Sequence, residues 1–179
     1  GGMMAILGLT DKDVEAVCKD ASVHGTVCAA NYNCPGQVVI SGEKKALEEA
    51  AELAKSKGAK AVPLKVSGGF HSHLMTAAQA RLAPELERLH VNRANMPVVA
   101  NVNAEYVREP EEIRSALIAQ ITSPVCWTQS MENLLRDGVN EFYEIGPGKV
   151  LGGLLRRIDP DKRVKNIETV RSLDVVLSQ

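Results

Sequence analysis

The stretch ANYNCPGQVVISG, residues 30–42, contains a short signature of two strands and a tight turn. Val27–Tyr32 and Gln37–Ser41 are short runs that indicate β-strands. Between them, the segment Asn33–Gly36 has proline directly before glycine, an order that suits the two central positions of a type II turn. The stretch therefore predicts a β-hairpin, and the hairpin organises the elements on either side of it.

Each side of the hairpin carries one helix and one strand. Thr10 is suited to cap the first helix, whose first turn is acidic, and Gly58 is suited to end the second. The predicted elements are a strand at Met3–Leu9, a helix at Asp11–Ala21, a helix at Lys44–Lys57 and a strand at Ala59–Lys65. The resulting order, β-α-β-β-α-β, is the split arrangement of a ferredoxin-like domain. We therefore expect residues 1–66 to form a ferredoxin-like small domain.

Residues 67–179 have a different order of predicted elements, in which helices and strands alternate. Strands are predicted at Pro97–Val102, Glu141–Ile145 and Val164–Ile167, and helices at Met75–Leu89, Glu111–Ile121, Thr128–Asp137 and, last, Val150–Ile158. Alternation of this kind indicates a parallel α/β sheet. Three strands are fewer than such a sheet usually has, and the chain begins with GGMMAILGL rather than with an initiator methionine. We therefore expect the sequence to be a piece of a longer protein, with an incomplete second domain.

The composition excludes several classes of function. The formal net charge is −1 and aromatic residues make up 3% of the chain, so neither a nucleic-acid-binding surface nor a membrane-surface face is expected. No apolar run reaches the length of a membrane span, and the first residues lack a charged-then-apolar pattern, so neither a membrane span nor a secretory leader is expected in these residues. The four cysteines form no CxxC pair, which favours a reduced, cytoplasmic protein.

Two histidines stand close together in VSGGFHSHLM, residues 66–75. Histidine serves near neutral pH as a general base or as a metal ligand. His71 and His73 lie at no recognised ligand spacing and have no acidic cluster beside them, so no metal site is predicted. A base needs a nucleophile, but the 179 residues contain no G-x-S-x-G elbow, and Ser67, Ser72 and Cys34 lack the context of one. The residues alone leave His71 open between a structural and a catalytic role.

A glycine-rich turn, GPGKVLGG, follows the predicted strand Glu141–Ile145. It resembles a dinucleotide-binding turn, but its spacing is G-x-G-x-x-x-G and Pro147 stiffens it. Gly148 and Lys149 at a helix start could attract an anion. A structural strand-to-helix turn is the favoured interpretation.

Five segments of the chain resemble one known family when they are taken together. They are ANYNCPGQVVISG, VPLKVSGGFHSHLM, PVVANVNAE, IAQITSPVCWTQSM and FYEIGPGKVLGGLLRRI. In order and spacing they are similar to the malonyl-CoA:acyl carrier protein transacylases, within the acyltransferase family of fatty-acid and polyketide synthesis. The resemblance covers nearly the whole chain and corresponds to the C-terminal three-fifths of the family.

The resemblance implies a fold and a set of roles. The fold is an α/β-hydrolase-like acyltransferase domain with an inserted ferredoxin-like small domain, so residues 67–179 would be the C-terminal portion of the acyltransferase core. His71 matches the catalytic base, and Gln120 matches the glutamine whose main-chain carbonyl orients the imidazole. Asn31 and Asn33 match hairpin asparagines near the substrate cleft. Phe70 resembles the pattern of malonyl-selective members.

The implied reaction is a ping-pong transfer of malonyl from coenzyme A to acyl carrier protein through a serine ester. The partners would be malonyl-CoA and the phosphopantetheine-bearing carrier protein, without a resident cofactor, a nucleic acid or a membrane. The family's nucleophilic serine matches no residue of this chain, so we expect the chain alone to be inactive. The alternative is a non-catalytic ferredoxin-like module for protein interaction or acyl carrier protein docking.

Overall fold

The computed structural model describes residues 1–178. The chain divides into two compact units, Gly1–Ser130 and Met131–Gln179, and the division falls within helix α5 (Trp127–Arg136). Each unit is described by itself below. All the residues singled out above for a catalytic or substrate-binding role lie in the first unit.

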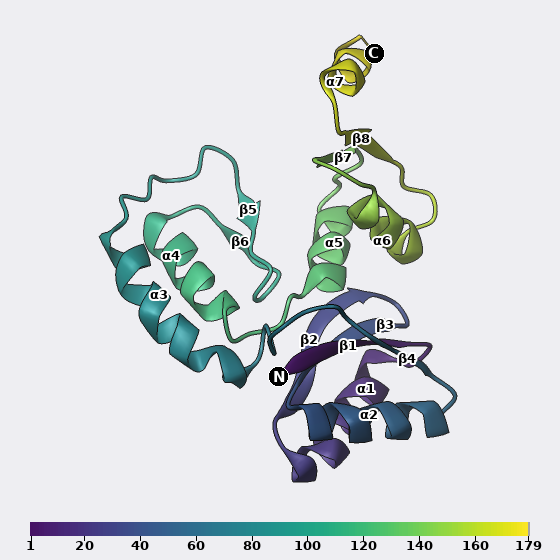
Figure 1. The fold of residues 1–179 in the computed structure, drawn as a ribbon. Coiled ribbons are helices and arrows are strands. Elements are labelled where there is room, and N and C mark those ends of the chain that lie inside the picture. The colour runs from purple at the N-terminus through teal and green to yellow at the C-terminus, as the bar shows by residue number, and fades with distance from the viewer. Residues whose placement is uncertain (179) are drawn as a thin grey trace. The chain divides into compact units, whose positions relative to one another are not determined.

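The first unit is built on a four-stranded antiparallel sheet with the order β2-β3-β1-β4 (Figure 1). The predicted hairpin is confirmed, because β2 and β3 pair antiparallel and Gly36 has the positive φ of 74° that this turn requires. β2 continues two residues further than predicted, with register shifts that mark β-bulges. The strands are β1 (Gly2–Leu7), β2 (Val27–Cys34), β3 (Gln37–Gly42) and β4 (Lys60–Pro63).

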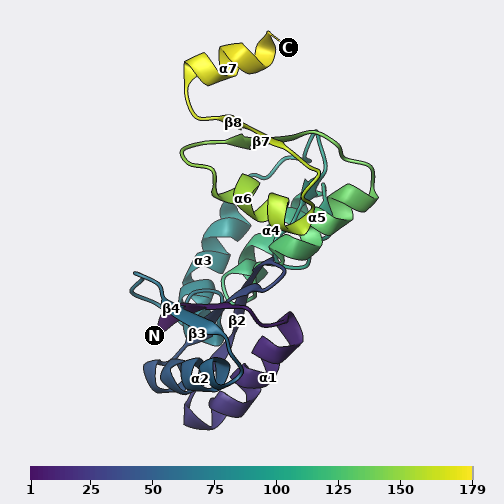
Figure 2. The same cartoon turned by 90° about the vertical axis from the view of Figure 1, so that its right-hand side faces the viewer.

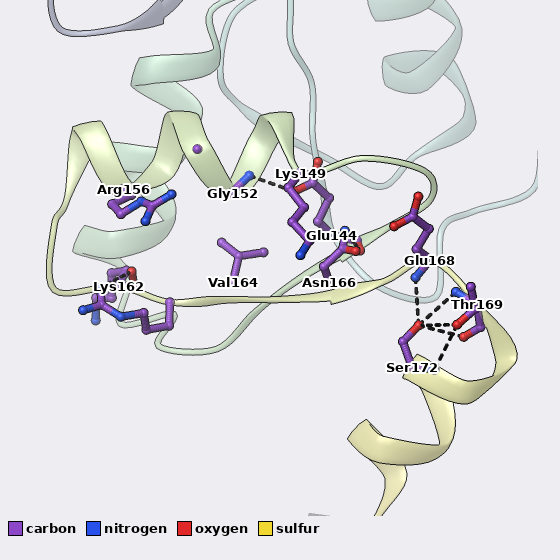
Figure 3. Close-up of a pocket in the computed structure, with 12 residues that line it drawn as sticks. Glu144, Lys149, Gly152, Arg156, Lys162, Val164, Asn166, Glu168, Thr169 and Ser172 are labelled. Atoms are coloured by element: carbon purple, nitrogen blue, oxygen red, sulfur yellow. Dashed lines mark hydrogen bonds between the residues drawn. The ribbon is translucent and has the colours of Figure 1, made fainter.

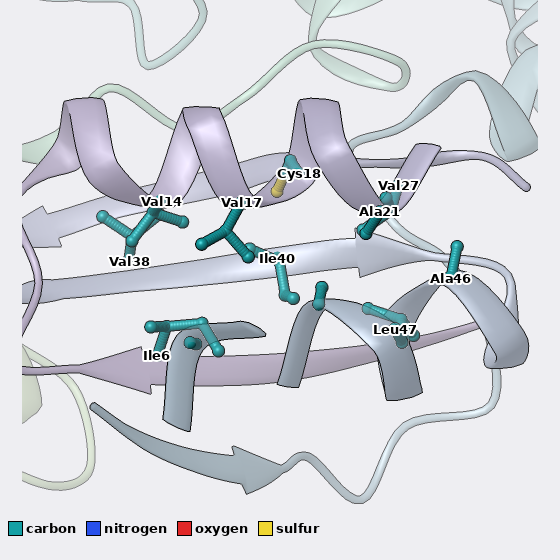
Figure 4. Close-up of a cluster of buried hydrophobic side chains, with 12 residues drawn as sticks. Ile6, Val14, Val17, Cys18, Ala21, Val27, Val38, Ile40, Ala46 and Leu47 are labelled. Atoms are coloured by element: carbon teal, nitrogen blue, oxygen red, sulfur yellow. The ribbon is translucent and has the colours of Figure 1, made fainter. Parts of the chain in front are cut away.

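Two helices, α1 (Asp11–Ala21) and α2 (Lys44–Ser56), cover one face of this sheet (Figures 1 and 2). Side chains alternate between the two faces of a strand, so the sheet contributes every second residue of a strand to the helix side. Ile6, Val38 and Ile40 are fully buried there against apolar residues of both helices (Figure 4). Thr10 caps α1 as predicted and accepts a hydrogen bond from the Asp13 amide at 3.2 Å.

The opposite face of the sheet supports the loop that contains His71. Met3, Ala5, Ala30 and Val39 form a smaller buried cluster on this face. The loop is attached beside it, where the Cys28 thiol contacts the His71 carbonyl oxygen at 3.9 Å. A Cβ placed on Gly69 would lie 2.7 Å from the tip of the Leu74 side chain and at an ordinary contact distance of 3.4 Å from the Ser41 hydroxyl, so the backbone of the loop lies close to the sheet at this position.

Two further helices of the first unit, α3 (Thr76–Arg88) and α4 (Pro110–Gln120), pack against each other (Figures 1 and 2). Arg114 of α4 is only 14% exposed and donates to the Leu86 and Leu89 carbonyls at 3.0 and 3.1 Å, so it fastens one end of the pair. Helices α3, α4 and α5 agree with the predicted helices to within two residues.

The strand predicted at Pro97–Val102 is only partly formed, and its expected place in a parallel sheet was wrong. Only Val98–Val99 form a strand, β5, and it pairs antiparallel with β6 (Tyr106–Val107) rather than joining a parallel sheet. The chain reverses directly after it, because Ala104 adopts a left-handed φ of 59° and its amide bonds the Ala100 carbonyl at 2.9 Å. Val98 is 51% exposed, so the apolar composition of this run does not reflect burial within residues 1–178.

The second unit contains a parallel pair of strands, with one helix between the two strands in the chain and another helix after the second strand. The predicted strands are confirmed as β7 (Phe142–Ile145) and β8 (Val164–Ile167), and the helix between them is α6 (Val150–Ile158). A final helix, α7 (Val170–Leu177), was missed, although Thr169 and Ser172 form a capping box at its start. Among residues 1–178, no helix combines the length and the apolar character needed to cross a membrane.

Two buried serines of the first unit allow a test of this packing. Both hydroxyls are at most 1% exposed, but that of Ser41 has no hydrogen-bond partner within residues 1–178, whereas that of Ser72 donates to the Gly69 carbonyl at 2.5 Å. Because an unpaired buried polar group is destabilising, we expect Ser41→Ala to raise the free energy of unfolding by about 1 kcal/mol. Ser72→Ala is the matched control and should lower the free energy of unfolding by a similar amount. Urea denaturation measures both changes, and a loss of stability in Ser41→Ala would contradict the description of that site.

Candidate functional site

His71 lies at the tip of a turn that its neighbours hold rigidly. Its backbone has a φ of 58°, a left-handed conformation that costs a side-chain-bearing residue about 1–2 kcal/mol. Ser72 stabilises the turn, since its hydroxyl donates to the Gly69 carbonyl and accepts from the Leu74 amide at 3.3 Å. Strain of this kind persists where the surroundings over-determine the backbone, and it is common at functional sites.

The imidazole of His71 faces the main chain of Gln120, which lies 49 residues further along the chain. Nδ1 lies 3.1 Å from the Gln120 carbonyl oxygen and 3.5 Å from the Gln120 side-chain nitrogen. That nitrogen has two hydrogens, and it donates to the Ser123 and Pro124 carbonyls at 3.0 and 3.1 Å. Because a carbonyl oxygen only accepts, Nδ1 carries the proton in this contact. In the neutral ring, Nε2 then carries the lone pair and is the atom that accepts a proton.

The acceptor for His71 is supplied by the end of helix α4. The last carbonyls of an α-helix have no partner inside the helix, and they lie at the negative end of the helix dipole. Gln120 is the last residue of α4, and the chain beyond it tightens, with the Thr122 amide bonding the Ala119 carbonyl at 3.2 Å. The Gln120 carbonyl is therefore one of the helix-terminal acceptors that the helix leaves unpaired and that His71 Nδ1 can bond.

The other predicted site residues lie around this pair without touching the imidazole. Asn31 pairs with Val125, and the Tyr32 amide bonds the Val125 carbonyl at 2.9 Å, so β2 runs beside the segment that follows Gln120. Asn33 lies further along β2 and is half-buried. Phe70 is 39% exposed, and its ring lies against Gly68, where an added Cβ would meet it at 3.3 Å. The structure therefore brings His71 and Gln120 into direct contact, whereas within residues 1–178 no side-chain hydrogen bond joins Asn33 or Phe70 to either of them.

The cysteines and acidic groups of the described residues offer no second centre. Cys34 is 1% exposed, and burial raises the pKa of the Cys28 thiol, so Cys28 does not present a thiolate near neutral pH. No group of three or more histidine, cysteine, aspartate or glutamate side chains that could hold a metal ion occurs within residues 1–178.

The glycine-rich turn of the second unit opens onto a pocket of about 510 Å³ (Figure 3). Lys149 and Arg156 line it, together with the carboxylates of Glu144 and Glu168. Glu144 accepts hydrogen bonds from the Leu151 and Gly152 amides, both at 2.9 Å, and so occupies the N-terminus of α6. A phosphate would need these same amides, so the structure supports the structural interpretation of GPGKVLGG over the dinucleotide one.

The fold is that of a protein with mixed helices and sheets, and its candidate site pairs a histidine ring with a main-chain carbonyl at the end of a helix. No family model matches the chain. The curated malonyl CoA-acyl carrier protein transacylase of Haemophilus influenzae is 44% identical over 177 residues, which is 98% of this chain and 57% of that protein. The enzyme of the same name from Bacillus subtilis is 45% identical over 93% of this chain and 53% of its own length. The chain is thus homologous to these transacylases over nearly all of its length.

Solved structures show the same relationship. An acyl-carrier-protein S-malonyltransferase from Burkholderia pseudomallei superposes with a TM-score of 0.95 at 44% identity, covering 99% of this chain and 58% of that chain. A malonyl-transacylase solved in complex with a type II polyketide synthase acyl-carrier protein superposes with a TM-score of 0.95 at 39% identity, again covering 99% and 58%. The chain spans a little more than half the length of the relatives it matches, a share consistent with the predicted fragment.

Two residues that build the site are not predicted from the sequence. Ser72 lacks the context of a nucleophile, and the structure shows it holding the His71 turn. Gln79 donates to two groups beside Gln120, the Ile118 carbonyl and the Thr122 hydroxyl. The signal available for Ser72 was its position directly before a helix start, which is typical of a capping residue. No sequence signal distinguishes Gln79 from an ordinary surface glutamine.

The backbone of His71 gives a testable prediction. Alanine and glycine at position 71 both lack the imidazole, but only glycine adopts the left-handed conformation freely. We therefore expect His71→Gly to be more stable than His71→Ala by about 1 kcal/mol in urea denaturation, despite the greater entropy of glycine in the unfolded chain. Equal stabilities, or a more stable alanine variant, would show that the turn is not strained.

Proposed function

We propose that the chain is the base-bearing part of a malonyl-CoA:acyl carrier protein transacylase. The observation that carries the proposal is the contact of His71 Nδ1 with the Gln120 carbonyl, which leaves Nε2 as the proton acceptor. Identity of 44% to a curated transacylase over 98% of the chain supports the choice of reaction. The malonyl-transacylase solved with an acyl-carrier protein supports the choice of second partner.

The chemistry requires His71 to act first as a base and then as an acid. A serine oxygen attacks the malonyl thioester, its proton passes to Nε2, and the bond between the acyl carbon and the coenzyme A sulfur breaks. The proton on Nε2 then passes to the departing thiolate. The phosphopantetheine thiol of the carrier protein attacks the serine ester by the same sequence in the opposite direction. The serine comes from a part of the protein outside these 179 residues.

The remaining predicted roles belong to the same proposal. Asn31 and Asn33 would bind the substrate from β2, which is supported by the pairing of Asn31 with the segment after Gln120. Phe70 would favour malonyl over bulkier acyl groups, since its partly exposed ring lies next to the base in the chain. No resident cofactor is required, and a cytoplasmic location remains the prediction made from the cysteine spacing.

The domain assignment is also proposed. Residues 1–66 would form the ferredoxin-like small domain, a proposal supported by the strand order β2-β3-β1-β4 and by two helices on one face. Residues 67–179 would belong to the α/β acyltransferase core. The boundary between the two compact units lies further along the chain than this proposed domain boundary, between Ser130 and Met131. The His71 loop and the α3–α4 pair therefore belong to the same compact unit as the sheet.

The test is a chimera in which the unmatched N-terminal part of the Haemophilus influenzae relative precedes this chain. We expect the chimera to form a covalent malonyl adduct, detected by intact mass, and to pass it to acyl carrier protein. His71→Ala should lower the transfer rate by about 100-fold or more, because general base catalysis contributes on that scale.

His73→Ala is the matched control, since His73 is exposed and the contact recorded for it uses only its main-chain carbonyl. It should transfer malonyl at the unchanged rate. Transfer by His71→Ala at the rate of the control would overturn the assignment of the base. A malonyl adduct on the 179-residue chain alone would overturn the view that the nucleophile lies elsewhere, and binding of acyl carrier protein without transfer by the chimera would favour the docking module.

A further inference from the structure

Gln79 joins the first half of helix α3 to the end of helix α4. Its side-chain nitrogen donates to the Ile118 carbonyl at 2.9 Å and to the Thr122 hydroxyl at 3.0 Å. One amide group thus contacts the chain two residues before Gln120 and two residues after it. Gln79 and its two acceptors are half-buried.

The Ile118 carbonyl accepts this bond because the helix ends there. In a continuing α-helix the amide of residue 122 would bond the carbonyl of residue 118. Here the Thr122 amide turns to the Ala119 carbonyl instead, and Gln79 supplies the donor for Ile118. A single NH₂ group has two hydrogens, so it satisfies both acceptors at once.

The helix that carries Gln79 begins directly after the His71 turn. Ser72 caps the short 3₁₀ turn at residues 73–75 that leads into α3, and the Thr76 hydroxyl bonds the His73 carbonyl at 2.6 Å. The end of α4 is therefore contacted twice by the segment that runs from His71 into α3. The His71 ring contacts the Gln120 carbonyl, and Gln79 of α3 contacts Ile118 and Thr122, which lie on either side of Gln120 in the chain. The distance between the His71 ring and the Gln120 carbonyl is therefore set by the position of α3 against the end of α4.

We propose that Gln79 is a positioning residue, which holds the Gln120 carbonyl at hydrogen-bonding distance from His71 Nδ1 and so keeps Nε2 as the proton acceptor. The proposal rests on the proposed role of His71 as the base. It adds a residue that touches neither the imidazole nor a reacting atom. Removal of its two hydrogen bonds frees the last turn of α4 to shift, and the imidazole loses its fixed tautomer.

The matched control lies at the other end of the same helix pair. Arg114 also makes two hydrogen bonds from a side chain to main-chain carbonyls, those of Leu86 and Leu89, and so joins α4 to the end of α3. Gln79→Met and Arg114→Met both keep an unbranched side chain with good helix propensity while they remove these bonds. Thr122→Val is a milder third variant, because it removes only one of the two acceptors of Gln79.

The first measurement uses the 179-residue chain with ¹⁵N-labelled histidine, and NMR reports which ring nitrogen of His71 is protonated. We expect Gln79→Met to move the Nε2 resonance toward that of a protonated nitrogen, Thr122→Val to move it less, and Arg114→Met to leave it unchanged. The second measurement uses the chimera, where Gln79→Met should lower kcat by up to about 100-fold with KM for malonyl-CoA unchanged.

An unchanged His71 tautomer in Gln79→Met would overturn the proposal, as would an equal shift in Arg114→Met, which would reveal a general loss of helix packing. Should Gln79→Met fail to fold, Thr122→Val decides the matter on the same criterion. A tautomer shift in Gln79→Met combined with full transfer by His71→Ala would uphold the positioning role and refute the proposed function. If His71→Ala abolishes transfer while Gln79→Met leaves the tautomer unshifted, the proposed function is upheld and the positioning role of Gln79 is refuted.

Discussion

The hydrogen bond from His71 Nδ1 to the Gln120 carbonyl is the interaction on which the site depends. It joins a turn supported by the sheet to the end of a helix 49 residues further along the chain. Each partner is also held by its own neighbours. The two hydrogen bonds of the Ser72 hydroxyl hold the turn, while the Gln120 side chain binds the Ser123 and Pro124 carbonyls beyond the end of the helix.

The four-stranded sheet makes this possible because its two faces serve different purposes. One face carries α1 and α2 and contains the larger buried cluster, which supplies most of the apolar burial of the first unit. The other face has only a small apolar cluster and accepts the backbone of the His71 loop. A one-residue slip in the β2–β3 register would turn the side chains of β2 to the other face, so the tight Pro35–Gly36 turn also constrains Cys28, which contacts the His71 carbonyl.

Local patterns were sufficient to predict most of the elements. The Pro-Gly turn, the Thr10 cap and the apolar spacing of α1 and α2 are signals that neighbouring residues create together, and the predicted hairpin and helices were found. The strand predicted at Pro97–Val102 ends early, at Val99, because an apolar run indicates burial but does not show the turn that begins inside it and is closed by the Ala104 amide on the Ala100 carbonyl. Helix α7 was missed, since its capping box uses serine in place of the usual glutamate.

The site itself was much less accessible to residue-level reasoning. Histidine chemistry alone left the role of His71 open. Its partner is the main-chain carbonyl of Gln120, and because every residue has such a carbonyl, the sequence does not show which one is used. Only the resemblance to a family brought Gln120 forward, and even this could not identify Gln79, whose role depends on the packing of α3 against the end of α4. Long-range contacts of this kind arise from tertiary structure and leave no periodic signal in the sequence.

The use of a helix-terminal carbonyl in place of a carboxylate has a physical consequence. An aspartate orients a histidine with a full negative charge, and hydrogen bonds to charged groups contribute about 1.5–3 kcal/mol, whereas neutral ones contribute about 0.5–1.5 kcal/mol. The Gln120 carbonyl lies at the end of α4, where the helix itself leaves it unpaired and available to His71. A carbonyl also has no pKa in the range where carboxylates titrate, so it accepts from Nδ1 at every pH at which the chain is folded. The hydrogen bond that orients His71 is therefore weaker than one to a carboxylate, but its acceptor does not change with pH. The surrounding side chains must accordingly control the geometry of the α4 terminus, since it has no ionisation to control.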